Sequence, residues 1–270
     1  MASNMPFIKN LASSDRKIRT SALASLHSFL SARQIASSLG PIDILKLWKG
    51  LFFAMWMCDR PIPQQNLCNE LADLIFVLPR DAVVPWLRGF WATMSREWTG
   101  IDVLRMEKFL LLVRRVVGAG FRWMKKDGKS GAWDADRVDE ILGLLVEWPL
   151  SLEDEAPVTG DEDEGALSPQ TIPAGLRLQV LDVWVDEAEK VGLLDEDDEE
   201  AKKILGRIVG AVDLLEQRTT RPGVRIRSKE SLADERLLKK DDTALDGDDS
   251  ATKDATKSGE DDEGWGGFDD

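Results

Sequence analysis

Two tryptophan-rich stretches are the strongest indication of the fold: LWKGLFFAMWMCDRP at residues 47–61 and FWATMSREWTGID at residues 90–102. Large aromatic side chains bury much apolar surface where helices pack together. Gly50 and Gly89 lie 39 residues apart, and each is followed by two large apolar residues. That offset is close to the length of one helix pair in HEAT-type repeats. The two stretches therefore predict equivalent positions in a repeated helical unit.

The sequence around these stretches has the pattern of consecutive helices. Ile18, Ala22, Leu26 and Leu30 follow the 3.6-residue period of one helix face. Proline residues separate this helix from the next ones, and no segment shows sustained two-residue alternation. We therefore predict an all-α fold, a HEAT-like superhelix of stacked antiparallel helix pairs over residues 1–217.

Charge is distributed unevenly along the 270 residues. Residues 1–150 carry 20 Lys and Arg against 15 Asp and Glu, a net charge of +5, whereas residues 151–270 carry 15 against 34, a net charge of −19. An acidic loop is expected at about residues 151–166. We predict an extended or disordered tail at residues 218–270, with a basic arm at 218–229 and an acidic end that contains Trp265 and Phe268.

Catalytic and metal-binding patterns are sparse. The chain has one histidine, His27, on an amphipathic helix, and two cysteines, Cys58 and Cys68, whose spacing does not match a zinc site. Glycine-rich phosphate loops after strands are absent, as are signal-peptide and membrane-spanning patterns. We expect a soluble intracellular protein with reduced, buried thiols, without enzymatic activity, cofactor or metal.

A long helix from Asp102 carries many basic residues. At 100° per residue, Val103, Met106 and Val113 share one face, and basic residues fall roughly opposite. This arc predicts contacts with RNA phosphates, or else it is an ordinary solvent-exposed face. The candidate RNA-contacting residues here are Arg105, Lys108, Arg115, Arg122, Lys125, Lys126 and Lys129.

The basic arm is a second candidate, because no acidic residue occurs between Gln217 and Ser228. Such arms often become ordered on nucleic acid or on an acidic partner, although a plain linker has the same composition. Its candidate residues are Arg218, Arg221, Arg225, Arg227 and Lys229.

Ten tryptophans and no tyrosine occur in the chain. Tryptophan packs well between helix layers, and tryptophan and arginine are favoured interface anchors, so either role is open for the tryptophans. The candidate core or protein-interface anchors are Trp48, Trp56, Trp91, Arg96 and Trp98.

The sequence of the two stretches, above all REWTGID at residues 96–102, resembles that of the eukaryotic ribosomal RNA-processing protein 1 family. The resemblance covers roughly residues 6–217. It implies a non-enzymatic nucleolar scaffold needed for processing large-subunit pre-rRNA, in the nucleus, within early pre-ribosomal particles. It also implies pre-rRNA and other assembly factors as partners, including a WD-repeat propeller and Brix-domain proteins, with no membrane and no small-molecule substrate.

Two other function classes compete with this interpretation. One is a metal-dependent RNA-processing enzyme, which magnesium-dependent RNA cleavage would reveal. The other is a generic HEAT-type adaptor or acidic chaperone whose acidic half binds basic clients. Co-purification of large-subunit pre-rRNA separates the scaffold from the adaptor, which would instead bring down histones or free ribosomal proteins.

Overall fold

The computed structural model describes residues 7–32, 36–128, 131–152 and 171–238. Its helices are α1 Phe7–Leu11, α2 Arg16–Ser31, α4 Pro41–Trp56, α5 Pro61–Asp73, α6 Arg80–Glu97, α7 Val103–Trp123, α8 Ala135–Glu147, α9 Ala174–Lys190, α10 Glu199–Arg218, α11 Pro222–Leu232 and α12 Glu235–Leu238. In these residues the only β pairing is an isolated bridge between Lys125 and Trp133. The predicted all-α class is confirmed.

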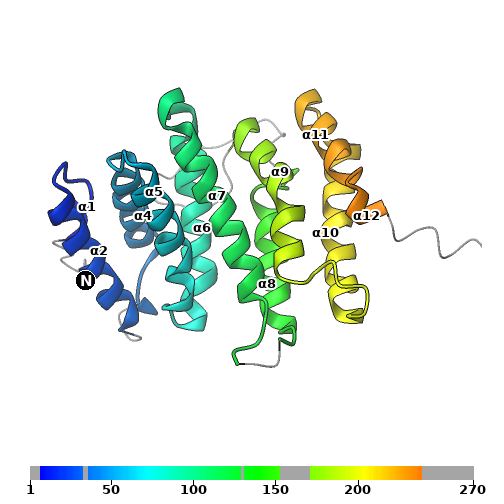
Figure 1. Ribbon diagram of the computed structural model, residues 1–270, viewed down its shortest axis with the longest axis horizontal. Helices are drawn as coiled ribbons and strands as arrows, with labels where there is room; N and C mark the ends of the chain where they lie inside the picture. The colour runs from blue at the N-terminus through cyan, green and yellow to red at the C-terminus, as the bar shows by residue number, and fades with distance from the viewer. Residues whose placement is uncertain (1–6, 33–35, 129–130, 153–170, 239–270) are drawn as a thin grey trace, which may run out of the picture. The chain divides into compact units, whose positions relative to one another are not determined.

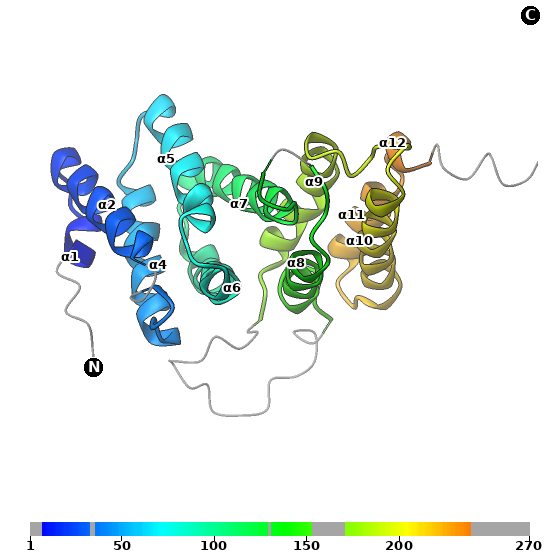
Figure 2. The same cartoon turned by 90° about the horizontal axis from the view of Figure 1, so that it is seen from below.

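The helices of residues 7–238 stack as pairs in chain order (Figure 1). One layer consists of α1, α4, α6, α8 and α10, each packed on the next. In the other layer α5 packs on α7, α7 on α9, and α9 on α11. The view in Figure 2 shows the same succession from another side. This arrangement is consistent with the predicted repeat superhelix.

Local sequence explains where several helices begin. The carboxylates of Asp102, Asp134 and Asp198 accept hydrogen bonds from backbone N–H groups in the first turns of α7, α8 and α10. Pro41 and Pro61 occupy the first position of α4 and α5, where no intrahelical N–H bond is lost. Side-chain caps and prolines thus define the repeat boundaries.

The first tryptophan-rich stretch forms much of the core between α4 and α6. The Trp48 ring lies 4.9 Å from that of Trp86 and 5.0 Å from that of Phe90. Trp48 Nε1–H donates to the backbone oxygen of Trp86 at 2.8 Å, so the buried indole keeps its hydrogen bond.

The glycines of the repeat lie at equivalent contacts. A Cβ atom on Gly50 would lie 3.0 Å from Leu11 Cδ1 on α1. A Cβ atom on Gly89 would overlap the Cγ2 methyl of Ile44 on α4. In both places glycine lets a helix approach the preceding helix of the same layer, which supports the 39-residue repeat read from the sequence.

The helical structure extends beyond residue 217, so the expectation of an extended basic arm is wrong. Helix α11 packs on α9 and α10, with Val224 and Ser228 fully buried. Arg236 of α12 then forms ion pairs with Asp186 and Glu189 of α9. A single buried valine and a set of arginine contacts hold this segment in place. Neither gives the sequence a strong helical period of apolar residues, so the helix could not be recognised from the sequence. The acidic tail from residue 239 and residues 153–170 of the acidic insertion lie outside the described residues.

Candidate nucleic-acid interface

Helix α7 packs against α5 on one side and α9 on the other. The expected division into one apolar and one basic face is therefore wrong. Val103 and Leu104 are 81% and 88% exposed, whereas Lys108 is 4% exposed. A helix between two neighbours is buried on two flanks. A division of its residues into two opposite faces by angle therefore does not separate the buried residues from the exposed ones.

Lys108 is buried and is excluded as an RNA contact. Its Nζ donates to the backbone oxygens of Trp56 and Cys58, at 2.7 and 2.9 Å, and lies 3.5 Å from an Asp59 carboxylate oxygen. The ammonium group thus satisfies carbonyls at the C-terminal end of α4, where positive charge is favourable. Burial lowers the pKa of Lys108, and Asp59 opposes that shift.

Arg105 is half-buried and contacts its own helix cap and one tryptophan. Its guanidinium lies 4.9 Å from the Trp56 ring centroid and donates to Asp102 at 3.2 Å. Trp56 in turn lies 5.9 Å from the Phe52 ring and 6.3 Å from the Phe109 ring. Arg105 therefore stabilises the beginning of α7. Because its guanidinium charge is partly neutralised by Asp102, it attracts an anionic ligand less strongly than an unpaired arginine would.

The C-terminal end of α7 brings two of the predicted cations close to aromatic rings and leaves a third exposed to solvent. Arg122 lies 5.1 Å from the Phe76 ring and pairs with Asp73 at 2.6 Å. Lys125 lies 4.8 Å from the Trp133 ring. Lys126 is exposed, and no ion pair involves it within the described residues. Among the predicted α7 residues, this end best suits contact with phosphates.

Two neighbouring arginines were not among the sequence candidates. Arg80 at the beginning of α6 and Arg137 of α8 each lie 5.1 Å from the centroid of the Trp123 ring at the end of α7. Carboxylates partly neutralise this group, since Arg137 pairs with Asp127 at 2.8 Å and Arg80 with Glu140 at 3.3 Å. The Arg137 guanidinium lowers the pKa of Asp127 through a hydrogen bond. Only the fold brings these residues together, so no local motif predicts them.

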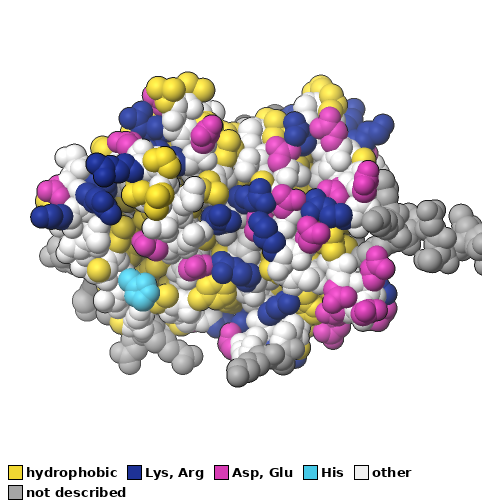
Figure 3. Space-filling model, viewed as in Figure 1, with side chains coloured by type: hydrophobic (Ala, Val, Ile, Leu, Met, Phe, Trp, Pro, Cys, Tyr) yellow, Lys and Arg dark blue, Asp and Glu magenta, His cyan; other side chains and the backbone are white. Residues whose placement is uncertain are grey.

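The middle of α7 carries one predicted and one unpredicted arginine. Arg115 is half-buried, and its Nε has no hydrogen-bond partner in the described structure. Arg114 instead bonds Glu187 at 2.6 Å and Asp186 at 2.9 Å, which joins α7 to α9. In Figure 3, Lys and Arg side chains gather over α7 with acidic side chains beside them. Lys129 lies outside the described residues.

The residues of the predicted basic arm mostly hold the chain together. Arg225 donates to the backbone oxygens of Thr219 and Glu216, and Arg227 pairs with Asp182 at 2.5 Å. Arg221 donates to the backbone oxygen of Ile172 at 3.3 Å. Arg218 and Lys229 are exposed, and they are the two arm residues best placed to reach a ligand.

The aromatic anchors divide into core and surface residues. Trp48, Trp91 and Trp98 are 2%, 2% and 6% exposed, which assigns them to the core. Trp56 is half-buried and Arg96 is exposed at the rim of a shallow pocket between α4 and α6. Of the five candidates, only Trp56 and Arg96 can touch a partner.

The described residues offer little to catalysis. They contain no group of three or more His, Cys, Asp or Glu side chains placed to hold a metal ion. Both cysteines are buried and unpaired, and burial raises the pKa of Cys68 to about 12, so its thiol is a poor nucleophile near neutral pH. None of the helices described here has the length and apolarity to cross a bilayer.

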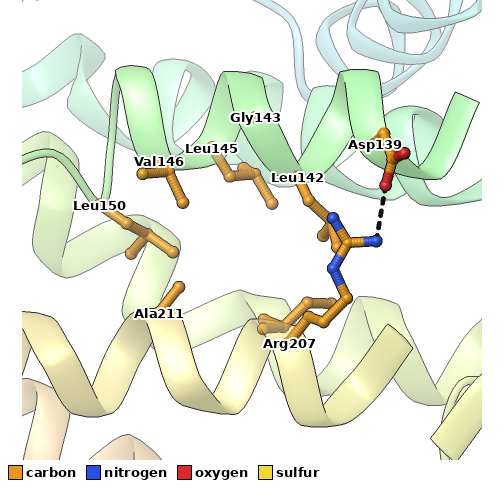
Figure 4. A pocket seen from close by; sticks show the side chains of 9 residues that line it. Asp139, Leu142, Gly143, Leu145, Val146, Leu150, Arg207 and Ala211 are labelled. Atoms are coloured by element: carbon orange, nitrogen blue, oxygen red, sulfur yellow. Dashed lines mark hydrogen bonds and ion pairs between the residues drawn. The ribbon is translucent and has the colours of Figure 1, made fainter. Parts of the chain in front are cut away.

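A small cleft between α8 and α10 is largely apolar (Figure 4). Its volume is about 280 Å³, and Leu142, Leu145 and Val146 of α8 face Ala211 of α10. Arg207 pairs with Asp139 at 2.7 Å at one end. Apart from this ion pair the described lining is aliphatic or glycine, with no Ser, Thr, Cys, His or Lys side chain, so its chemistry is that of packing.

Comparisons with known proteins agree with the resemblance in the tryptophan-rich stretches. The model of the family described as "Nucleolar protein, Nop52" matches residues 2–265. "Ribosomal RNA processing protein 1 homolog B" of Homo sapiens is 33% identical over 189 residues, which cover 69% of this chain and 22% of that protein. "Ribosomal RNA processing protein 1 homolog A" of Mus musculus is 33% identical over 187 residues, covering 68% and 34%. A Caenorhabditis elegans homolog is 34% identical over 146 residues, covering 54% and 36%. The chain thus spans between about a fifth and just over a third of the length of these relatives.

Proposed function

Because the chain belongs to the nucleolar Nop52 family, we propose that it acts in the nucleolus in ribosomal RNA processing, as a non-enzymatic scaffold of large-subunit precursors. The observation that carries this proposal is the family match over residues 2–265, together with the names of the relatives. We thus extend to this chain the role that the names of the relatives state, although the chain corresponds to only one part of each longer relative.

The fold supports binding rather than catalysis. Stacked helix pairs expose long helix faces on both layers, and such surfaces suit extended contacts with several partners. No described cluster positions a metal ion, and the two thiols are buried. A scaffold needs neither, whereas a metal-dependent nuclease needs a set of carboxylates around its ions.

Pre-rRNA is the first proposed partner. Its contacts are the cations at the end of α7, exposed Arg122 and Lys126 and half-buried Lys125, with Arg115 on the same helix and Arg218 and Lys229 near the C-terminal helices. Lysine and arginine near aromatic rings suit RNA, because phosphates take the charge and unpaired bases stack on the rings or on guanidinium planes. The other proposed partners are assembly factors, which by family resemblance include a WD-repeat propeller and Brix-domain proteins.

Binding of the purified chain to a large-subunit pre-rRNA fragment tests the RNA part of this proposal. A Lys125→Glu/Lys126→Glu variant should bind more weakly at every salt concentration. Its plot of log affinity against log salt should be shallower by about 1–2, because up to two phosphate contacts are lost. Lys203→Glu on α10 reverses one charge at another exposed helix position and should have a smaller effect than either Lys125→Glu or Lys126→Glu alone.

Two results would contradict the proposal. An unchanged salt slope in the double variant would exclude the end of α7 as the RNA contact. Cleavage of the same RNA fragment by the purified chain in magnesium, abolished by chelation, would replace the scaffold with an enzyme.

A further inference from the structure

The second helix layer is interrupted between α2 and α5. Helix α2 packs on α1, whereas α5 packs on α7, and α4 lies on the third side of the space between them (Figure 2). The result is a groove of about 810 Å³ bounded by α2, α5 and the end of α4. We call this the α2–α5 groove, and its long axis lies between two helices of 16 and 13 residues.

The floor and one lip of the α2–α5 groove are aliphatic. Leu26, Leu67 and Leu71 line it as buried residues. Met57 and Ile62 also line it and are 37% and 72% exposed, which is unusual for large apolar side chains. Figure 3 shows hydrophobic side chains between basic side chains and the chain's histidine on this face. Solvent-exposed aliphatic surface of this kind favours burial against another apolar surface.

One end of the groove is positively charged. Arg16, Arg19 and Arg60 line it, and within the described part of the chain none of them forms an ion pair. Arg19 donates to the backbone oxygens of Ser13 and Ser14, at 2.7 and 2.9 Å, which leaves its charge without a carboxylate. The only acids in the lining are Asp59, which lies 3.5 Å from Lys108 Nζ, and Glu70.

The beginning of α2 adds to this positive end. Its first turn contains Arg16, Lys17 and Arg19 but no acidic residue, although basic residues are unfavourable at a helix N-terminus. The Asp15 cap accepts from the N–H groups of Lys17 and Ile18 and offsets one charge. A carboxylate of a partner that binds at this end would therefore lie near Arg16, Arg19 and Arg60.

The lining distinguishes a protein partner from RNA. It contains no Phe or Trp, and single-stranded nucleic acids usually need aromatic rings on which the bases stack. Aliphatic side chains between two helices instead match the apolar face of a third helix, with anchors at positions i, i+3 or i+4, and i+7. A helix here would also fill the interruption in the layer.

We propose that the α2–α5 groove binds an amphipathic helix of another protein, with its apolar face on the aliphatic floor and its acidic residues beside Arg16, Arg19 and Arg60. This groove would be one partner-binding surface of the scaffold. The inference rests on the proposed function only in that a scaffold needs surfaces that bind partners. The experiment below contains no ribosomal RNA, so it can fail while the rRNA-processing role stands.

Selection from a displayed library of peptides of roughly 16 residues, about four helical turns, tests the proposal on the purified full chain. The selected peptides should carry apolar residues at helical spacing and Asp or Glu clustered towards one end. Their binding should be measured by fluorescence anisotropy. Ile62→Glu and the Arg16→Glu/Arg60→Glu variant should each weaken it by roughly tenfold or more, as loss of an interface anchor does.

Matched controls lie elsewhere on the chain. Ile226→Glu on α11 changes another strongly exposed aliphatic residue, and Lys203→Glu on α10 reverses another exposed charge. Both should leave peptide binding unchanged. Circular dichroism checks that each variant is folded, which we expect because the substituted side chains are exposed or at the rim of the groove.

Five results would overturn the proposal. The first four are no enrichment of peptides, enrichment of basic peptides, equal loss of binding in the controls, and displacement of the selected peptide by an RNA oligonucleotide that binds the wild type but not the groove variants. Self-association that Ile62→Glu abolishes would assign the groove to a second copy of the chain and would also overturn it.

Discussion

The contact between α4 and α6 predicts that Gly89→Ala destabilises the chain. Alanine gains about 1 kcal/mol over glycine in a helix interior. However, its Cβ would overlap Ile44 Cγ2 and would lie 3.1 Å from Trp48 Cδ1. Ile44 and Trp48 are 3% and 2% exposed, so neither has room to move. Overpacking of this kind costs about 1–3 kcal/mol, and a β-branched neighbour favours the upper end. We expect a net loss of about 1–2 kcal/mol.

Gly143→Ala provides the matched control. Gly143 is also inside a helix, α8, but a Cβ there would meet nothing within 4 Å. The chain should gain about 1 kcal/mol from helix propensity alone. Equilibrium urea unfolding followed by far-UV circular dichroism measures both changes. The two variants should therefore shift the midpoint in opposite directions.

A double variant identifies the cause of the loss. Ile44→Leu removes the Cγ2 methyl that the new Cβ would meet, so Gly89→Ala should cost less in that background. If Gly89→Ala stabilises the chain as much as Gly143→Ala, the close approach of α4 and α6, and with it the repeat assignment of Gly50 and Gly89, is refuted.

Three further predictions concern buried and paired groups. Lys108→Met should lower the free energy of unfolding in urea by about 1–3 kcal/mol, because the backbone oxygens of Trp56 and Cys58 lose their donor, and Lys126→Met, an exposed control, should change it little. An equal effect of both would contradict the buried role of Lys108. Burial raises the pKa of Cys68 from 9.0 to about 12, so its contribution to stability is complete below pH 9 and is lost as the pH rises towards 12. Native Cys68 should accordingly resist iodoacetamide until the chain unfolds, and alkylation at the unfolded rate would refute its burial. Arg236 lowers the pKa of Asp186 through a hydrogen bond, so their stabilising contribution is present above pH 3.8 and is lost as the pH falls through the lower folded pKa. Arg236→Ala should speed hydrogen exchange in residues 222–238 at neutral pH, and unchanged exchange would show that α12 is held by other contacts.

The sequence predicted the helical class and the start of α7 because those depend on local signals. Asp102 caps α7 where the pattern placed the start of a long helix, and prolines separate helices as expected, with Pro41 and Pro61 beginning α4 and α5. The repeat offset between Gly50 and Gly89 was also readable, since both glycines face the same kind of neighbour.

The candidate surface was less predictable because it depends on which flanks of a helix are covered. Lys108 and Arg115 lie on one arc of α7, yet Lys108 is buried by α5 and the end of α4 while Arg115 is half-exposed. The grouping of Arg80 and Arg137 around Trp123 joins residues from three elements. Helix α11 went unrecognised because its amphipathic period is weak and its stability depends on contacts with α9 and α10.

Affinity purification of the tagged chain from nucleolar extract, with crosslinking and sequencing of the bound RNA, tests whether the chain acts on large-subunit pre-rRNA. We expect enrichment of large-subunit pre-rRNA together with assembly factors, and loss of crosslinks in the Lys125→Glu/Lys126→Glu variant. Recovery of histones or free ribosomal proteins without pre-rRNA would contradict it.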